Sequence, residues 1–136
     1  MRHKFIKHKF ELKIVPKGPW STQQLKFHQI CSQDRKFVQL QDFFEDQQFS
    51  YFVSLYRPKT LRDLLMSKKG GAAQNLVRLF GEAQIKSIVL ELAMGLSELH
   101  KAGIVHRALD MDAIFVLTRG GENQFRIGRF DQAVQL

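Results

Sequence analysis

The sequence predicts an α+β fold, in which strands and one helix come first and a long helix with two further strands follows. Two strand-like runs, 37–44 and 49–56, are separated by a short polar turn. Apolar residues recur at spacings of three and four through residues 82–101, as in an amphipathic helix. Two more strand-like runs, 114–117 and 125–128, flank a glycine-containing turn. The 136 residues are enough for one domain with a modest core.

The first half of the chain is expected to hold a strand, a helix and a hairpin. Residues 3–16 have the composition of a strand, which Pro16 and the turn residues after it bring to an end. Ser21 and Thr22 are expected to cap the helix that follows. The apolar side of that helix is small, with three members: Leu25, Phe27 and Ile30. The polar segment 45–48 then joins the two strands of the hairpin.

The second half is expected to contain two helices. Thr60 can cap a short helix over residues 61–69. The long helix, over residues 82–101, carries one continuous apolar stripe. The stripe has six members: Ile85, Ile88, Val89, Leu92, Leu96 and Leu99. Gly103 lies just past the helix, where a left-handed residue commonly ends one.

The composition excludes several classes of protein. Hydrophobic residues make up 44% of the chain, yet no apolar run is long enough to cross a bilayer. The first ten residues lack the apolar core and cleavage site of a secretory signal. The single cysteine, Cys31, excludes an internal disulfide. These features indicate an intracellular protein, in the cytoplasm or in a cytoskeletal or organellar assembly, that is not secreted.

The net charge of +8, from 21 basic and 13 acidic residues, raises the question of an anionic partner. The basic residues are concentrated only in the first 17 positions: Arg2, Lys4, Lys7, Lys9, Lys13 and Lys17. Phe5, Phe10 and Ile14 alternate with them at roughly strand spacing, which indicates a strand with a solvated basic side. We expect this side to meet an acidic protein surface. The less favoured alternative is a basic component that binds nucleic acid or ribonucleoprotein.

Several segments resemble those of protein kinases. ELKIV (11–15) resembles the third-strand segment with the kinase lysine, which corresponds to Lys13. FVQLQDFFEDQQFSYFVSLY resembles the fourth and fifth strands, and the helix 82–101 with GIVHRALDMDAIFV resembles the helix and catalytic loop. RIGRFDQA (126–133) falls at the magnesium-binding motif. The resemblance covers nearly the whole chain and implies two regions. Residues 1–56 would form a partial N-lobe, an antiparallel sheet with one helix, and residues 57–136 the first part of a helical C-lobe.

The segment that resembles the catalytic loop has lost its catalytic residues. In the family, an aspartate accepts the proton of the substrate hydroxyl; Ala108 stands in its place. The loop lysine is replaced by Asp110, and the asparagine that holds the second magnesium is replaced by Ala113. His106 is expected to have a structural role, packing beneath the Phe of the next motif. Arg107 is expected to face solvent or a partner.

The magnesium-binding motif is degenerate as well. Its aspartate is replaced by Arg129 and its glycine by Asp131, and only Phe130 remains. Asp110, Asp112 and Asp131 are interpreted as surface carboxylates rather than a relocated metal site. The histidines show no zinc-ligand spacing. Neither a metal nor a cofactor is therefore expected.

The sequence also departs from the family at the positions that contact the nucleotide in kinases. The helix position that supplies the glutamate for the lysine's ion pair falls at or near Leu25, so Lys13 lacks a partner of the expected kind. The alanine that roofs the adenine is replaced by Glu11, and a carboxylate in a dry slot is costly unless it is paired. The floor residue is the larger Phe115. No glycine precedes Gly18, so the glycine-rich phosphate loop is absent.

The resemblance and its departures together imply a non-catalytic pseudokinase domain that binds proteins or serves as a structural subunit of a larger assembly. In kinases, later helices cover the inner face of the long helix. The apolar stripe between Ile85 and Leu99 is therefore expected to be partly exposed, and to be covered by another subunit or by the rest of a longer polypeptide. The alternative is an atypical kinase-like transferase with a rearranged nucleotide site near Lys13 and Asp131.

Overall fold

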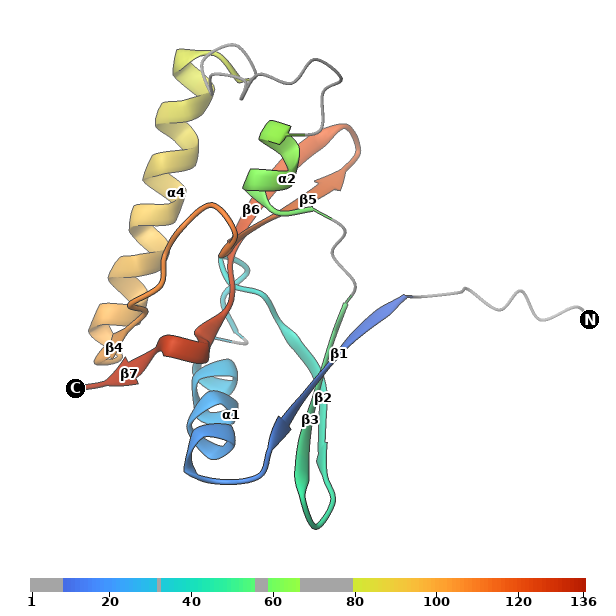
Figure 1. The fold of residues 1–136 in the computed structure, drawn as a ribbon. Coiled ribbons are helices and arrows are strands. Elements are labelled where there is room, and N and C mark those ends of the chain that lie inside the picture. Colours follow the sequence, from blue (N-terminus) through green and yellow to red (C-terminus); the bar gives the residue numbers. More distant parts are fainter. Residues whose placement is uncertain (1–8, 32, 56–58, 67–79) are drawn as a thin grey trace, which may run out of the picture.

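The computed structural model describes residues 9–31, 33–55, 59–66 and 80–136, and Figure 1 shows how their helices and strands are arranged. A three-stranded sheet and one helix form the N-terminal part, and a long helix with short strand pairs forms the C-terminal part. Residues 3–8 of the expected first strand, the last turn of the expected short helix at 67–69 and the boundary between 56 and 57 lie outside the described residues.

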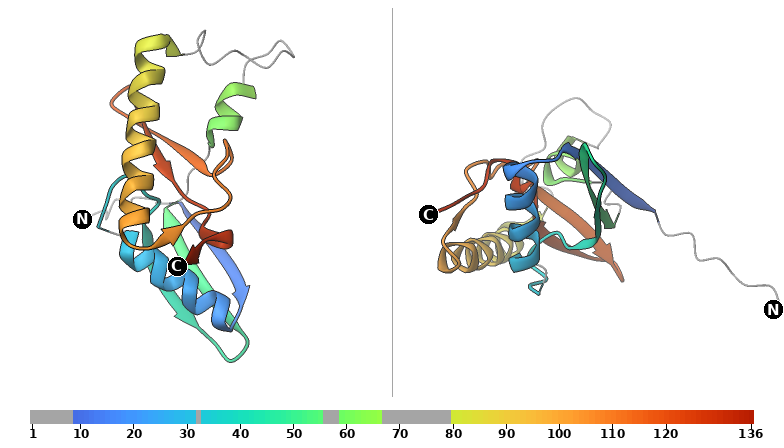
Figure 2. Two further views of the ribbon diagram at one scale, coloured as in Figure 1. Left: turned by 90° about the vertical axis from the view of Figure 1, so that its left-hand side faces the viewer. Right: turned by 90° about the horizontal axis from the view of Figure 1, so that it is seen from below.

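The N-terminal sheet contains strands β1 (Phe10–Pro16), β2 (Leu40–Glu45) and β3 (Phe49–Leu55). Its strand order is β1-β3-β2, and both pairings are antiparallel. Between β1 and β3 the register is continuous, from Phe10 opposite Leu55 to Pro16 opposite Phe49. The expected hairpin is confirmed by β2 and β3. In the view from below, helix α1 (Pro19–Cys31) lies between this sheet and the long helix (Figure 2).

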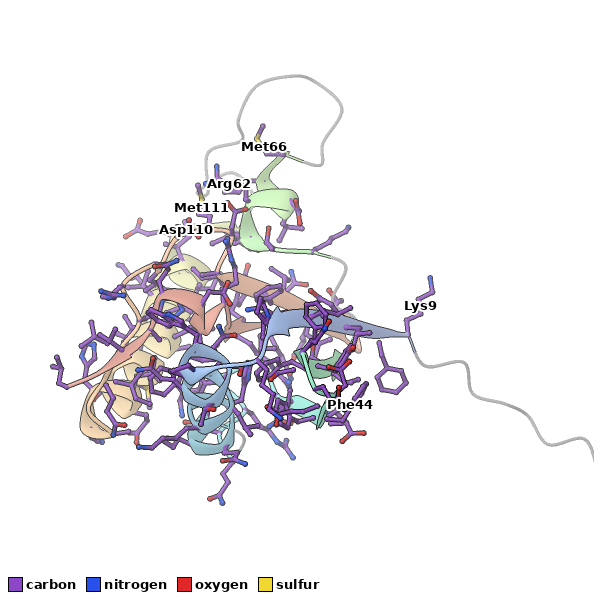
Figure 3. The ribbon with its side chains drawn as sticks, turned by 60° about the horizontal axis from the view of Figure 1, so that its bottom comes forward. Lys9, Phe44, Arg62, Met66, Asp110 and Met111 are labelled. Carbon is purple, nitrogen blue, oxygen red and sulfur yellow. The ribbon has the colours of Figure 1, made fainter. Side chains whose placement is uncertain are left out.

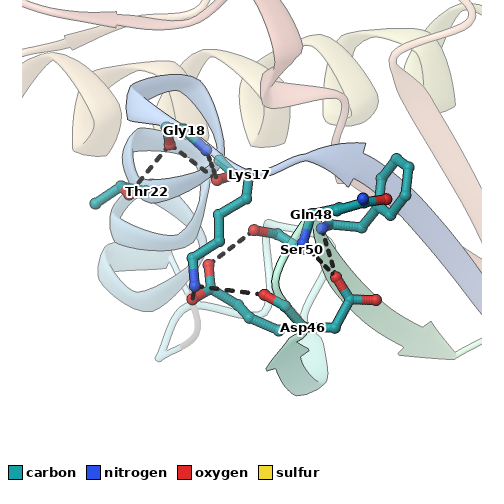
Figure 4. A network of polar contacts seen from close by, with 9 residues as sticks. Lys17, Gly18, Thr22, Asp46, Gln48 and Ser50 are labelled. Carbon is teal, nitrogen blue, oxygen red and sulfur yellow. Dashed lines mark hydrogen bonds and ion pairs between the residues drawn. The ribbon is translucent and has the colours of Figure 1, made fainter.

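A group of polar contacts fixes the hairpin turn to the end of β1 (Figure 4). Lys17 Nζ lies 3.3 Å from the Glu45 carboxylate and donates to the Asp46 carbonyl at 3.5 Å. Asp46 Oδ1 accepts from the backbone N–H groups of Gln48 and Phe49, each at 2.7 Å. The Asp46 side chain thus stabilises the turn between β2 and β3, because it accepts hydrogen bonds from the backbone N–H groups of the turn.

Helix α1 begins at Pro19, before the residues that were expected to cap it. Ser21 and Thr22 lie in its first turn, where both hydroxyls donate to the Gly18 carbonyl (Figure 4). Proline suits this first turn because it has no N–H that would remain unsatisfied there. Ser21 Oγ also accepts from the Gly18 N–H at 3.0 Å. The expected capping residues therefore stabilise the start of the helix from inside it.

The buried side of α1 also differs from the expected one. Its members are Ser21, Gln24, Phe27 and Cys31. Of the expected apolar side only Phe27 is fully buried, whereas Ile30 is exposed. Polar Gln24 is buried because this side of the helix borders a cleft in which it has a cationic partner, as described below. An apolar pattern could not reveal that arrangement.

The short helix α2 (Leu61–Met66) is capped as predicted. The Asp63 N–H donates to Thr60 Oγ1 at 3.2 Å, and the Thr60 N–H donates to Asp63 Oδ2 at 2.9 Å. This reciprocal pair is a capping box, with an aspartate in the position that glutamate usually takes. It fixes the start of α2 close to the strands that follow the long helix.

Helix α4 (Glu82–Lys101) has the predicted bounds and ends before Gly103, whose φ is +73°. The next segments are β4 (Ile104–Val105), β5 (Ile114–Arg119), β6 (Glu122–Ile127), the 3-10 turn η1 (Phe130–Gln132) and β7 (Val134–Gln135). Strands β5 and β6 form the expected second hairpin, and β4 pairs with β7. The hairpin turns at two left-handed glycines, as a two-residue connection requires.

Two apolar clusters form the core. The first lies where α1, α4 and β6 meet and contains Phe27, Cys31, Phe37, Leu99, Ile104, Ile127, Phe130 and Ala133. The second lies between α2, α4 and the β5–β6 hairpin and contains Leu61, Leu65, Ile88, Ile114, Val116 and Phe125. In the described ranges, no helix is both long and apolar enough to span a membrane.

This core corrects the expected exposure of the α4 stripe. Ile88 and Leu99 are buried, and Leu92 and Leu96 pack against the two clusters. Ile85 is half-buried, and of the six stripe residues Val89 alone is largely exposed. The stripe is covered from inside because α2 and β6 reach α4. The apolar residues that α4 presents to solvent are instead Val89, Leu90 and Met94, each at least half exposed.

Candidate functional site

A cleft of about 240 Å³ lies between the N-terminal sheet and the segments that begin β5 and η1. It is lined by Glu11, Lys13, His28, Val38, Leu40, Phe52, Ser54, Phe115, Arg129, Phe130 and Asp131. The structure thus brings together six residues that the sequence placed at nucleotide and magnesium positions. The volume is below the ~300–1,000 Å³ typical of sites that enclose small ligands.

Lys13 has two partners in this cleft. Its ammonium forms an ion pair with the Asp131 carboxylate and donates to Gln24 Oε1 at 3.1 Å. The helix position at or near Leu25 supplies no carboxylate to Lys13, as the sequence indicated; the partner is Asp131, which the sequence placed among the surface carboxylates and whose side chain is 37% exposed. Gln24, rather than Leu25, is the α1 residue that reaches the lysine. The carboxylate comes from the opposite side of the cleft, at the position of the motif's glycine.

Burial and neighbouring charges shift the pKa values of two groups in the cleft, Lys13 and His28. Burial and the charge of Arg129 lower the pKa of Lys13 from its ordinary 10.5, while Glu11 acts in the opposite direction. Burial, and then the positive charge of Lys13, lower the pKa of His28 to about 4. His28 is therefore neutral at physiological pH, in keeping with its position between the rings of Phe52 and Phe130.

Glu11 lies at the mouth of the cleft and is exposed to solvent. The sequence placed this carboxylate in a dry slot, where its charge would be costly. The structure corrects that expectation because the Glu11 side chain is exposed to water. Phe115, at the position of the adenine floor, lies in the cleft as expected.

Phe130 is the centre of an aromatic group beneath the cleft. It is buried, and its ring centroid lies 5.4 Å from that of His28, 5.6 Å from that of His106 and 6.2 Å from that of Phe37. Arg129, just before it, has a left-handed backbone conformation, with φ 59° and ψ 67°. The one residue kept from the magnesium motif is thus a packing residue.

His106 has hydrogen-bond partners at both ring nitrogens. Nε2 donates to the Gly128 carbonyl at 2.7 Å, and Nδ1 accepts from the Ala108 N–H at 3.2 Å. This pattern assigns the neutral tautomer with the proton on Nε2. The ring is buried, and its contact with Phe130 is the packing that the sequence predicted. His106 ties the loop around Ala108 to the end of β6.

The acidic residues of this loop are also engaged in structural contacts. Asp110 Oδ1 accepts from the N–H groups of Asp112 and Ala113, at 2.9 and 3.0 Å. Asp112 Oδ2 pairs with Arg62 Nε of α2 at 2.9 Å, and Figure 3 shows Arg62 beside Asp110 and Met111. Ala113 is fully buried. Within the described ranges, no three His, Cys, Asp or Glu side chains lie together as a metal site would require.

Arg107 joins the loop to η1, a contact that sequence reasoning missed. Its Nε donates to the Gln132 carbonyl at 2.7 Å, and its φ is +63°. The side chain is otherwise exposed, as expected. A backbone carbonyl as the partner of an arginine leaves no sequence signal, so the contact could not be anticipated.

A larger cavity, about 710 Å³, lies away from these residues. It is formed by the C-terminal ends of α1 and α4 and by the segment between α1 and β2, and includes Cys31, Asp34, Phe37, Glu98 and Lys101. Burial, and then the nearby Asp34, raise the pKa of Cys31 to about 12, so its thiol is a poor nucleophile. None of the residues that resemble kinase positions lines this cavity.

No family model matches the sequence, and no curated protein matches it either. Its fold, however, matches solved structures. One of these is the structure of the kinase PK-1 of Cydia pomonella granulovirus, which matches with a TM-score of 0.73 over 97% of this chain. The chain has a kinase-like fold. Sequence identity to the viral kinase is 21%, so the likeness is one of fold.

The kinase-like chain spans less than half of the viral kinase, since the match covers 46% of that protein. This extent agrees with the expected α+β architecture, a small antiparallel sheet with one helix followed by the first part of a C-lobe. The cleft is lined by residues that the sequence resemblance placed at nucleotide positions, among them Glu11, Lys13 and Phe115.

Proposed function

We propose that the kinase-like chain is a non-catalytic domain that binds other proteins as a subunit of a larger assembly. The observation that carries the proposal is the engagement of Lys13 by Asp131 across the cleft. In protein kinases this lysine belongs to the parts that position the nucleotide, and an acidic residue of the next motif holds the metal. In this chain the lysine and the nearest acidic residue of that motif neutralise one another.

The loop chemistry supports the same conclusion. The methyl group of Ala108 has no atom that could accept a proton from a substrate hydroxyl. Ala113 is buried and has no oxygen for a metal ion, and Asp110 already accepts two backbone hydrogen bonds. Arg129 adds a positive charge where a magnesium ion would need a negative one.

The surface that would contact a partner is the outward face of α4, formed by Val89, Leu90 and Met94. Adjacent exposed apolar side chains of this kind mark protein-binding surfaces when a partner covers them. The exposed guanidinium groups of Arg107 and Arg129 could add electrostatic complementarity toward an acidic partner. The proposed partner is therefore a protein with an apolar contact surface for α4 and acidic groups for the two arginines.

Thermal denaturation with and without magnesium and ATP tests the loss of nucleotide binding. A ligand present at 100 times its Kd stabilises a protein by about 2.7 kcal/mol, which would raise Tm by several degrees. We expect no change in Tm for the native chain. A shift that Lys13→Met removes and Lys86→Met preserves would contradict the proposal and favour a rearranged transferase, since Lys86 is exposed on α4, away from the cleft.

A further inference from the structure

We propose that two copies of this chain associate through the outer edge of β1, in an antiparallel pairing that joins their two sheets. β1 is an end strand of the sheet, and among the described residues no strand lies along its other edge. Its seven residues pair with β3 in a continuous register without a bulge. A regular edge strand of this kind is a ready template for another strand. The inference does not depend on the loss of catalysis.

The direction of the backbone groups of β1 follows from one hydrogen bond. The Lys17 N–H donates to the Gln48 carbonyl at 2.9 Å, in line with the register of β1 and β3. In an antiparallel ladder such bonded pairs recur at every second residue. The bonds between β1 and β3 therefore fall on odd-numbered residues. The N–H and C=O groups of Leu12 and Ile14 point to the outer edge instead.

The side chains of β1 select one register for a second copy. In this register the two-fold axis that relates the copies passes between Leu12 of one copy and Leu12 of the other. Phe10 of each copy then lies opposite Ile14 of the other, and Glu11 of each copy lies opposite Lys13 of the other. A shift by two residues in either direction instead places Lys13 opposite Lys13 or Glu11 opposite Glu11, and like charges directly opposite are destabilising. A shift by one residue would place apolar side chains opposite charged ones.

The selected register also agrees with the backbone directions. It pairs even-numbered residues with even-numbered residues, and Leu12 and Ile14 are residues whose polar groups face the outer edge. Lys13 is available for the contact with Glu11 of the other copy, because its side chain remains 40% exposed beside Asp131. The self-complementary order of charges is what favours a second copy over an unrelated strand.

The apolar side of β1 gives this pairing its hydrophobic component. Phe10, Leu12 and Ile14 share one side of the strand and are 55%, 50% and 54% exposed. Opposite them on β3 lie Val53 and Tyr51, so this side of the sheet is apolar across two strands. In the joined sheet the three side chains of each copy would pack against the same three of the other.

The opposite edge of the sheet, on β2, is less suited to the same role. Its register with β3 shifts between Leu40 and Asp42, which marks a bulge or irregularity. A bulge disturbs the ladder and discourages pairing at an edge. The β2 edge also carries Asp42 and Glu45, so two copies joined there would bring acidic residues together. β2 therefore supplies the control.

The first experiment is sedimentation of the full chain at physiological ionic strength, where the repulsion between two copies of charge +8 is screened. We expect the native chain to form a dimer. Leu12→Lys places two lysines opposite one another at the axis and should reduce the mass to that of one chain, 15.8 kDa. Phe44→Lys, at a residue of similar exposure on β2, should leave the dimer intact.

The second experiment is a cross-link at the axis. In the proposed register the two Leu12 Cα atoms form a hydrogen-bonded pair about 5.5 Å apart, which is within the range that a disulfide spans. With copper–phenanthroline as oxidant, Leu12→Cys should give a disulfide-linked dimer, whereas Phe44→Cys should not. Cys31 should contribute no background, because it is buried and its pKa is raised to about 12.

A native chain that remains a monomer throughout the concentration range would overturn the proposal. Any strand that pairs with the β1 edge would then have to come from something other than a second copy. A dimer that survives Leu12→Lys but is lost in Phe44→Lys would place the interface on the β2 edge and would overturn it equally. Circular dichroism of each variant establishes that loss of the dimer is not loss of the fold. None of these outcomes bears on nucleotide binding, so each proposal can fail without the other.

Discussion

Single residues determine the chemistry of the cleft and of the loop beside it, and some of these residues can be recognised in the sequence. Ala108, Ala113 and Arg129 can be recognised as changes of chemistry because each occupies a position whose neighbours keep the family's pattern. The pairing of Lys13 with Asp131 could not be recognised in that way. The two residues are brought together by packing, and a carboxylate one position beyond a phenylalanine has no signal of its own.

His28 gives a prediction at this scale. Its pKa is about 4 in the folded chain, against 6.5 for a histidine in water, so the unfolded chain binds a proton first as the pH falls. The free energy of unfolding should therefore be unaffected by His28 above pH 6.5 and decline as the pH falls from 6.5 towards 4. The expected loss between pH 7 and pH 5 is about 2 kcal/mol.

Urea denaturation at these two pH values measures the effect. His28→Phe should remove most of the decline, because a phenylalanine can occupy the space between Phe52 and Phe130 without titrating. His100→Gln, at an exposed position of α4, should retain it. An equal decline in native and His28→Phe chains would show that other groups cause it.

At the scale of elements, local patterns predicted what local forces determine. The bounds of α4 and the Thr60 cap are as predicted, since apolar periodicity and capping are properties of neighbouring residues. Which residues of α4 are exposed was predicted less well. Contacts with α2 and β6 bury most of its stripe, and those contacts depend on how distant elements pack.

Gly128, between β6 and η1, gives a prediction at this scale. A Cβ atom there would lie 2.7 Å from both Phe115 Cε2 and Val38 Cγ2. Gly128→Ala should therefore destabilise the chain by about 1–3 kcal/mol, through overpacking against these two side chains. In Gly18→Ala the added methyl group meets nothing within 4 Å, so its effect should stay within about 0.5 kcal/mol. Equal stabilities of the two variants in urea would contradict this account.

At the scale of the whole molecule, α4 separates the core from the proposed partner surface. The sequence predicted that the stripe from Ile85 to Leu99 would be the partner surface, whereas the structure buries most of that stripe and leaves Val89, Leu90 and Met94 exposed. Which side of the helix is exposed could not be predicted from periodicity alone, because both sides of α4 carry apolar residues.

Two substitutions distinguish these sides. Leu99 is almost fully buried, so Leu99→Glu should place an unpaired charge in the core and cost more than about 4 kcal/mol, enough to abolish the cooperative unfolding transition. Leu90→Glu should leave stability within about 0.5 kcal/mol, since its side chain is exposed. Chemical denaturation measures both. A large loss of stability in Leu90→Glu would mean that this side belongs to the core.

The ion pair between Lys13 and Asp131 also has a consequence for how the chain folds. The two residues are 118 positions apart, whereas the hairpins and α4 depend on contacts between near neighbours in sequence. Contacts between distant residues form late because the chain between them must first be ordered. We therefore expect the ion pair that joins the two sides of the cleft to form late in folding, and to form without any ligand in the cleft.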